Sequence, residues 1–228
     1  MRKKQTDQVT EAYAFSKLWD ELIPSMGAYE HLETITEKAM CFSMALLKHG
    51  RCKEFPFHNW VHTNEVVRNV KTILRQQHIP ESEAEPLIIA AWMHDIGFVV
   101  TYQQHEVVSC QLAERFLVLF DYPTHKLELV LTCIRATQIP QKPEHPLAEI
   151  LCDADLFHLG TADFTHRNAL LRQEWEKELG KSFSEDEWQE LNLIFLQQHQ
   201  YFTAYGKDCL QEGKQQNIYK LSNLNHQR

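Results

Sequence analysis

Residues 82–98 read SEAEPLIIAAWMHDIGF, and this stretch indicates the fold class. Its apolar residues recur at intervals of three and four, as on one face of a helix: Ile88, Ala91, Trp92 and Ile96. Ser82, followed three positions later by Glu85, predicts a capping box at the helix start. The polar pair His94 and Asp95 lies near the end of the same apolar run. The stretch therefore predicts a buried helix that ends in two side chains able to bind a metal.

The same helical period recurs on both sides of this stretch. Apolar stripes predict helices around 15–22, 31–47, 62–74, 108–116, 127–134, 147–156 and from Ser184 to Tyr205. Ser184 with Glu187 forms a second expected capping box, and Gly160 is an expected C-terminal cap. The proline-rich segment 138–146 is expected to be an interhelical loop, and the polar tail after Asn217 is expected to fray. The sequence thus predicts an all-α protein.

The composition narrows the class of protein. With 228 residues, 43% of them hydrophobic, the chain suits one large globular domain. It has 31 acidic and 23 basic residues and no basic tract, so we expect no binding to duplex nucleic acid. No apolar run approaches about 18 residues, and the start MRKKQTDQVTEAYAF lacks the apolar part of a secretory signal. We therefore expect no membrane association, a cytoplasmic location, and reduced thiols at the six cysteines.

Thirteen histidines are the unusual feature of the composition. Histidines and aspartates interrupt apolar helical stretches at four places: His58 and His62 in FHNWVH, His94 and Asp95 in AAWMHDIGF, His105 in QQHE, and Asp153 and Asp155 in ILCDADLFHLG. A carboxylate buried without a partner costs several kcal/mol, so these aspartates need hydrogen bonds or a cation. Imidazoles and carboxylates together suit Mn, Fe, Zn or Mg. Taken singly, each group could equally be an ordinary core histidine or a helix cap.

Asp153 and Asp155 are two positions apart, which is about 200° around a helix, so they face different sides. Leu151 and Leu159 lie four positions before and after Asp155, which puts Asp155 on an apolar, inward stripe. The surroundings of Asp153 include Glu149 and are more mixed. We therefore expect Asp155 to face a metal and Asp153 to accept hydrogen bonds beside the site or from the backbone.

The ordered set His62, His94, Asp95 and Asp155 resembles the H…HD…D pattern of the HD superfamily of metal-dependent phosphohydrolases. The spacings are 32 residues between the two histidines and 60 between the two aspartates, and the contexts HNWVHTNEVV, AAWMHDIG and CDADLFHLG suit that family. The resemblance implies that these four residues bind one or two divalent ions of Mn, Mg, Fe, Ni or Zn, with Asp95 best placed to bridge two ions.

The resemblance also has implications for the whole chain. It implies a single compact helical HD-type domain over residues 1–228, with its core at 55–160 and flanking helices at 1–50 and 161–216. The segment 161–180 could shape a pocket or a dimer surface, although its pattern is more typical of a solvated amphipathic helix.

A narrower similarity concerns FHNWVH, which resembles the H-N-x-x-H segment of cyclic-nucleotide phosphodiesterases. That similarity implies that His62 is a metal ligand and His58 the general acid. The rest of the phosphodiesterase signature is absent, so a cyclic nucleotide is one candidate substrate among others. Arg135 in IRATQ could hold phosphate oxygens, and His105 could contact the substrate or a second ion.

The function implied by the HD resemblance is hydrolysis of a nucleotide or another small phosphate mono- or diester. A metal lowers the pKa of bound water from 15.7 to about 7, which makes hydroxide available at neutral pH. Two other functions stay open: a di-iron oxygenase of HD type, and a non-catalytic regulatory module that binds a metal and a nucleotide. The expected partner is a small phosphorylated substrate, with a nucleotide favoured, and a homodimer also stays open.

Overall fold

The structure is a computed structural model that describes residues 14–224. The basic start of the chain, residues 1–13, and residues 225–228 lie outside that range. Every regular element among the described residues is helical and none is a strand, which confirms the all-α prediction. All six cysteines are free thiols. Among the described helices, none combines the length and the apolar character that a membrane span requires.

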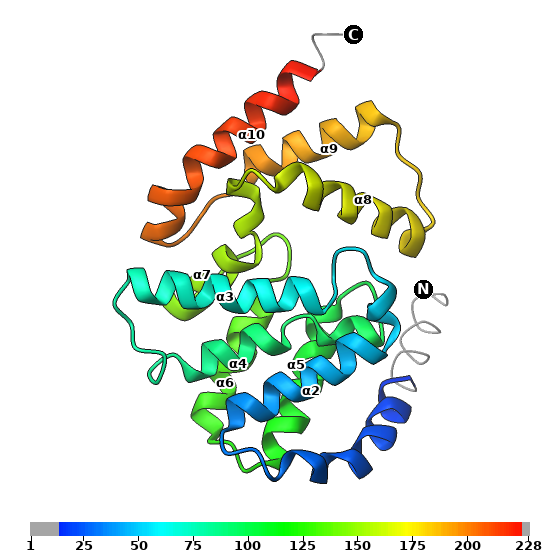
Figure 1. Ribbon diagram of the computed structural model, residues 1–228, viewed down its shortest axis with the longest axis vertical. Helices are drawn as coiled ribbons and strands as arrows, with labels where there is room; N and C mark the ends of the chain where they lie inside the picture. The colour runs from blue at the N-terminus through cyan, green and yellow to red at the C-terminus, as the bar shows by residue number, and fades with distance from the viewer. Residues whose placement is uncertain (1–13, 225–228) are drawn as a thin grey trace.

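Six helices form the larger body of the molecule, at the lower end of Figure 1. They are α2 (Ile35–His49), α3 (Trp60–Gln76), α4 (Glu85–Met93), α5 (His105–Leu119), α6 (Thr124–Ala136) and α7 (Pro146–Asp155). Residues 86–93 of α4 are all buried, with α2, α3 and α6 packed around them. A helix that is apolar on every side needs cover on every side, so α4 takes the central position.

Short 3-10 segments connect these helices. They are η1 (Ile23–Tyr29), η2 (Arg51–Glu54), η3 (Ile96–Val99) and η4 (Phe157–Gly160). Residues 14–22, which precede η1, are also helical. The proline-rich segment 138–146 connects α6 to α7, as the sequence indicated.

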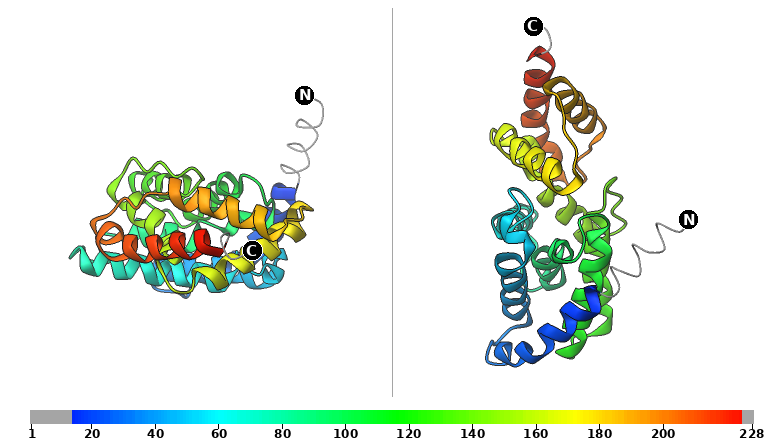
Figure 2. Two further views of the ribbon diagram at one scale, coloured as in Figure 1. Left: turned by 90° about the horizontal axis from the view of Figure 1, so that it is seen from above. Right: turned by 90° about the vertical axis from the view of Figure 1, so that its right-hand side faces the viewer.

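Three further helices form the other end of the molecule: α8 (Phe164–Leu179), α9 (Glu185–Gln198) and α10 (Gln211–Leu224). The right-hand view of Figure 2 shows this end as a separate layer stacked on the six-helix body. A small second core of Leu159, Phe164 and Leu196 joins the layer together. Segment η4 packs against both α8 and α10, so the chain directly after α7 connects the two ends of the molecule.

Two predicted helix caps are wrong. Ala84 is the N-cap of α4 and no side chain caps that helix, so Ser82 and Glu85 form no capping box there. Pro86 in the first turn lacks an amide hydrogen, which removes one of the donors that a cap would satisfy. Helix α7 ends at Asp155, and Gly160 is the last residue of the 3-10 turn η4 that follows, so it does not cap α7. The second capping box, at Ser184 and Glu187, is confirmed.

The C-terminal region differs most from the prediction. Helix α9 ends at Gln198, and residues 199–203 are not helical, so the expected continuous helix to Tyr205 is wrong. A π-helical turn, η5 (Gly206–Leu210), then leads into α10. The break has a physical reason: the backbone N–H groups of Phe202 and Thr203 donate to the Asp153 carboxylate, each at 2.9 Å, instead of to a preceding helical turn.

The polar tail is also ordered over its described part. Asn217 is buried, and its side-chain amide donates to the carbonyl oxygens of Leu159 at 3.0 Å and Thr161 at 2.9 Å. These bonds attach α10 to the chain around η4. The expectation of a frayed tail after Asn217 is therefore wrong for residues up to 224.

Candidate metal centre

Three elements bring the predicted ligands together. His62 lies in the first turn of α3, His94 and Asp95 follow α4 directly, and Asp155 is the last residue of α7. His62 Nε2 lies 3.1 Å from Asp155 Oδ1 and 3.5 Å from Asp95 Oδ2. His94 Nε2 lies 3.2 Å from Asp95 Oδ2 and 3.6 Å from Asp155 Oδ1. We call these four residues, His62, His94, Asp95 and Asp155, the metal cluster. One ligand atom from each of His62, His94 and Asp155 lies within 4.8 Å of the other two, and this grouping could hold a metal ion.

The ring of His94 is oriented by its own helix. Its Nδ1 donates to the carbonyl oxygen of Ala91 at 2.9 Å, which leaves a lone pair on Nε2 of the neutral ring. His94 Nε2 and Asp95 Oδ2 are both buried without a hydrogen-bond partner. Burial opposes charge on His94, but the carboxylates of Asp95 and Asp155 outweigh it and hold the pKa of His94 well above its usual value. The cluster therefore requires a cation, either a proton or a metal ion.

The donor set fits a divalent metal. Two imidazole nitrogens and carboxylate oxygens converge, which suits Zn, Fe, Mn or Ni. A metal-binding histidine commonly donates its other ring N–H to a carbonyl or carboxylate, and His94 does so through Ala91. The two buried atoms without partners, His94 Nε2 and Asp95 Oδ2, are also the atoms that a metal ion would contact.

Arg167 of α8 lies against the metal cluster. Its Nη2 donates to His62 Nδ1 at 3.2 Å, its Nη1 lies 3.4 Å from Glu65 Oε2, and its guanidinium covers the Phe57 ring at 4.5 Å. Only 6% of Arg167 is exposed, and its Nε is buried without a hydrogen-bond partner. A buried guanidinium with an unused donor is suited to binding a further anion.

His105 contacts the other oxygen of Asp95. Its Nε2 lies 3.3 Å from Asp95 Oδ1, and its ring stacks on Phe98 with 3.6 Å between centroids. Gly97 allows this approach, because a Cβ atom there would lie 2.0 Å from the carbonyl oxygen of His105. The backbone N–H of Gly97 also donates to Ser109 Oγ of α5 at 2.8 Å. A glycine after the His-Asp pair is therefore needed to bring α5, and with it His105, beside Asp95.

His58 lies beside the metal cluster and is held by Glu174 of α8. The Glu174 side chain is fully buried; it contacts His58 Nδ1 at 2.5 Å and accepts from the Tyr102 hydroxyl at 2.9 Å. It also accepts from the backbone N–H groups of Phe57 and His58 at 2.8 and 2.9 Å. Burial disfavours the charged ring, but Glu174 outweighs it and raises the pKa of His58. Among the described residues, no hydrogen bond engages His58 Nε2, so this atom is free to exchange a proton.

The two aspartates of α7 face opposite sides, as their spacing requires. Asp155 faces the other three residues of the metal cluster. Asp153 faces the C-terminal layer, where it accepts from the backbone of Phe202 and Thr203 and from the Thr203 hydroxyl at 2.7 Å. A Cβ atom on Gly206 would lie 2.3 Å from Asp153 Oδ2, so the chain approaches this carboxylate closely. The role of Asp155 as a metal ligand stays a prediction.

The structure brings most of the sequence-predicted residues together, with one exception. His58 and His105 lie beside the metal cluster. Arg135, in contrast, is exposed on α6, where its Nη2 contacts Thr132 Oγ1 at 3.3 Å. No contact between Arg135 and the metal cluster is found in the described part of the chain. The only arginine that interacts with the cluster among the described residues is Arg167.

Glu174 and His158 are site residues that the sequence reasoning missed, and Arg167 entered it only as part of a segment that could shape a pocket. His158 packs against Phe57 with 5.4 Å between ring centroids, and burial with the nearby cations lowers its pKa to about 3. A signal for the other two exists: Phe164, Arg167 and Glu174 lie at helical spacing on one face, and all three are buried. Segment 161–180 is thus an amphipathic helix whose buried face contacts the site, which favours the alternative that it shapes a pocket.

The fold and the site together define a class: a helical protein with a buried histidine–aspartate cluster that could hold a divalent metal. Residues 59–160 match the HD domain family, and this range includes all four residues of the metal cluster. The chain therefore contains an HD domain, which confirms the resemblance to the HD superfamily. HD domains are generally metal-dependent phosphohydrolases. A comparison with curated proteins found no match.

Proposed function

We propose that this protein is a phosphohydrolase that uses a divalent metal to cleave a nucleotide or another small phosphate mono- or diester. One observation carries the proposal. Beside the metal cluster lie a buried arginine with an unused donor, Arg167, and a histidine held by a buried glutamate, His58. A cation site, an anion-binding group and a proton donor are the three components that hydrolysis of a phosphate ester needs.

The residues that would hold the metal are His62, His94, Asp95 and Asp155. When bound, a divalent metal lowers the pKa of water and withdraws charge from the phosphoryl group. The chain contributes orientation: the Ala91 carbonyl fixes the His94 ring, and the ends of α4 and α7 hold the two carboxylates. Buried surroundings with low polarity strengthen each of these charge interactions.

Arg167 is the residue that we expect to hold the phosphate oxygens. It donates to His62 Nδ1 here, so the neutral His62 ring carries its proton on Nε2, which faces Asp155. Coordination through His62 Nε2 would move that proton to Nδ1, where the guanidinium could no longer donate. Arg167 would then need another acceptor, and a substrate phosphate can provide two oxygens to its planar fork.

His58 is the residue that we expect to protonate the leaving group. In the proposed reaction, water first gives up a proton to the solvent, and the resulting hydroxide oxygen bonds to phosphorus. The bond from phosphorus to the leaving oxygen breaks, and His58 Nε2 gives the leaving oxygen a proton. Glu174 holds Nδ1 and raises the pKa of the ring, which favours the charged form before the transfer. Because Glu174 also accepts from two backbone N–H groups, the position of His58 depends on α8.

A second candidate, the di-iron oxygenase, has one supporting observation. Asp95 has His105 at Oδ1 and His94 at Oδ2, so it could bridge two ions if His105 is a ligand. The described residues place no further histidine in contact with Asp95 Oδ1. Anaerobic reconstitution with Fe(II), followed by optical spectroscopy on exposure to oxygen, distinguishes the two functions.

The test of the main proposal is a screen of nucleotides and other phosphate esters with added Mn²⁺, Mg²⁺, Ni²⁺ or Zn²⁺. Two variants make the screen specific for this site. Arg167→Gln should raise KM about tenfold or more, since a charged hydrogen bond is worth roughly 1.5–3 kcal/mol. Arg135→Gln, on the exposed face of α6, should leave KM unchanged. The reverse result would favour the sequence-based prediction for Arg135, and no turnover of any ester would refute the proposed function.

A further inference from the structure

A polar cavity lies in the C-terminal layer, away from the metal cluster. Its volume is about 500 Å³, and its walls come from α9, the segment after α9, η5 and α10. None of the residues that line it belongs to the metal cluster. Pockets for small molecules typically measure roughly 300–1,000 Å³. The cavity is therefore large enough for a ligand of its own.

The charge of the cavity is unusual for this protein. Its lining includes Lys207, Lys214, His199 and four glutamines, and no aspartate or glutamate from the described residues lines it. The chain as a whole carries a net charge of −8. A cavity lined by cations and amides in an acidic protein is suited to an anionic ligand.

Lys214 is the main reason to expect such a ligand. Only 2% of it is exposed, and its Nζ pairs with no carboxylate in the described part of the chain. Nζ donates to the His199 carbonyl oxygen at 2.6 Å, lies 3.4 Å from His199 Nδ1 and lies 5.3 Å from the centre of the Tyr201 ring. Burial lowers the pKa of Lys214, and the charge of Asp153 offsets this only in part. Lysine is almost never buried without a counter-charge.

His199, which contacts Lys214, provides a second indication. Because Lys214 Nζ has no lone pair, it can only donate to His199 Nδ1, so the neutral ring carries its proton on Nε2. Burial and the Lys214 charge lower the pKa of His199 to about 3, which keeps the ring neutral near pH 7. Nε2 is buried without a hydrogen-bond partner. The cavity wall thus contains both a cation without an anion and a donor without an acceptor.

We infer that this cavity is a second ligand site, which binds the phosphate group of a small molecule. A phosphate brings a charge of about −1.5 to −2 and several acceptor oxygens, which match the two lysines and the glutamine amides. Lys214 supplies the buried charge. Lys207 is exposed and supplies a second charge at the entrance.

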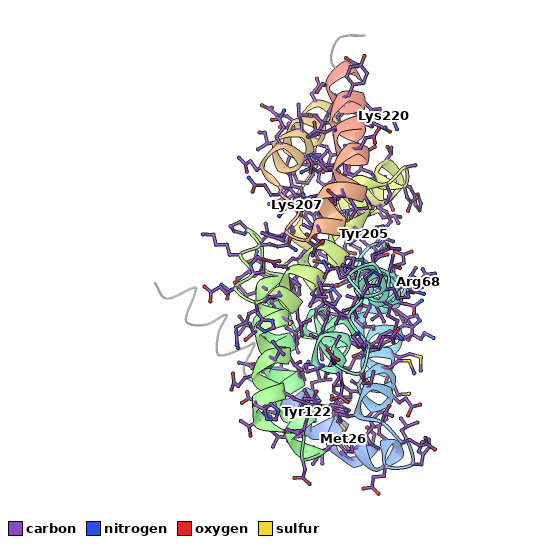
Figure 3. The ribbon with its side chains drawn as sticks, turned by 90° about the vertical axis from the view of Figure 1, so that its left-hand side faces the viewer. Met26, Arg68, Tyr122, Tyr205, Lys207 and Lys220 are labelled. Carbon is purple, nitrogen blue, oxygen red and sulfur yellow. The ribbon has the colours of Figure 1, made fainter. Side chains whose placement is uncertain are left out.

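The fold also provides a matched control. Lys220 is an exposed residue on α10, the helix that carries Lys214, and it does not line the cavity. Figure 3 shows Lys207 near the junction of the C-terminal layer with the six-helix body and Lys220 towards the far end of α10. Replacing Lys220 therefore changes the net charge by the same amount without changing the cavity.

The experiment is calorimetric titration of the full chain with inorganic phosphate at constant ionic strength. The protein is first passed over a chelating resin, because a metal in the metal cluster would itself bind phosphate. We expect saturable binding that Lys214→Met weakens roughly ten- to a hundredfold, as for a charged hydrogen bond. Lys207→Gln, which is exposed and should not disturb folding, should weaken binding about two- to fivefold. Lys220→Met should bind like the unchanged protein.

Ribose 5-phosphate, titrated in the same way, identifies the source of the phosphate group. Tighter binding than inorganic phosphate indicates that the cavity takes a phosphate ester, and equal binding indicates free phosphate. No saturable binding by the unchanged protein overturns the inference. Binding that neither Lys214→Met nor Lys207→Gln weakens overturns it as well, because the phosphate would then bind elsewhere, for example at Arg167. If Lys214→Met does not fold by circular dichroism, the Lys207→Gln and Lys220→Met pair decides.

Discussion

The metal cluster and the cavity of the C-terminal layer both bury charge, but with opposite imbalance. In the metal cluster, carboxylate oxygens and a histidine lone pair face one another and need a cation. In the cavity, Lys214 and a buried histidine N–H have no anion or acceptor. Since a buried charge or donor without a partner is costly, each imbalance indicates whether the ligand that binds there is a cation or an anion. Helix α7 links the metal cluster to the C-terminal layer: Asp155 belongs to the cluster, and Asp153 binds the backbone of Phe202 and Thr203, which follow the cavity residue Tyr201.

The largest effect should come from removing the cation site. Asp155→Asn should abolish metal-dependent turnover and leave a helical protein that gains no thermal stability from Mn²⁺. A metal at 100 times its dissociation constant stabilises by about 2.7 kcal/mol, so the unchanged protein should show a clear shift in melting temperature. Metal analysis measures whether the variant binds the ion, and thermal melts with and without Mn²⁺ measure whether the ion stabilises it. A variant that still binds and is stabilised by Mn²⁺ would show that Asp155 is not a ligand.

The next largest effect should come from the proton donor. His58→Ala should keep the metal and lose about 10²–10⁴-fold in rate on an ester with a poor leaving group, and much less on a nitrophenyl ester. Glu174→Gln should show the same dependence on the leaving group, because it holds the same ring. Glu178→Gln, one helical turn further along α8, is the control. Equal losses on both esters would argue that His58 only positions the substrate.

Asp153→Asn tests the connection between the two regions. We expect it to retain metal binding, with about a 10–100-fold loss in metal affinity or activity, as for residues that support metal ligands. It should also weaken the attachment of residues 202–203 and lower the free energy of unfolding by about 1–3 kcal/mol. The measurement is the metal content of Asp153→Asn compared with that of Asp155→Asn. If Asp153→Asn loses the metal and Asp155→Asn keeps it, the assignment of the two aspartates is wrong.

The smallest effect that we expect is on the pH dependence of stability, and it comes from His199 in the wall of the cavity. The pKa of His199 is about 3 in the folded protein and 6.5 ordinarily, so the unfolded chain binds more protons between these values. Stability should therefore fall as pH drops below about 6.5, with a contribution from His199 of about 1–2 kcal/mol between pH 7 and 5. The groups that face His199 are the ammonium of Lys214 and the ring of Tyr201.

The check for this last prediction is urea unfolding at pH 7 and pH 5. His199→Gln should lose less stability than the unchanged protein over this range, because glutamine does not titrate. The same pH dependence in both proteins would show that other groups, and not His199, bind the protons.

The fold class was readable from the sequence because it depends on local pattern, whereas the four residues of the metal cluster were indicated by their resemblance to the H…HD…D pattern of the HD superfamily. Helical spacing in 82–98 predicts a buried helix whatever it packs against, and α4 is indeed buried. The 200° separation of Asp153 and Asp155 is a property of any helix, so their opposite directions followed from two positions in the sequence.

Tertiary structure alone decided the parts of the site that come from distant segments. Glu174 contacts His58 across 116 residues of chain, and Arg167 contacts His62 across 105. In the sequence, their spacing from Phe164 indicates that both residues share a helix face with an apolar residue, but no local pattern shows that this face packs against the site. The same reason applies to Arg135: the sequence allows it to hold phosphate oxygens or to be a solvated arginine, and the packing of α6 directs it to solvent. The end of α9 depends on Asp153, which offers the backbone of Phe202, 49 residues later in the chain, an acceptor that no local pattern includes.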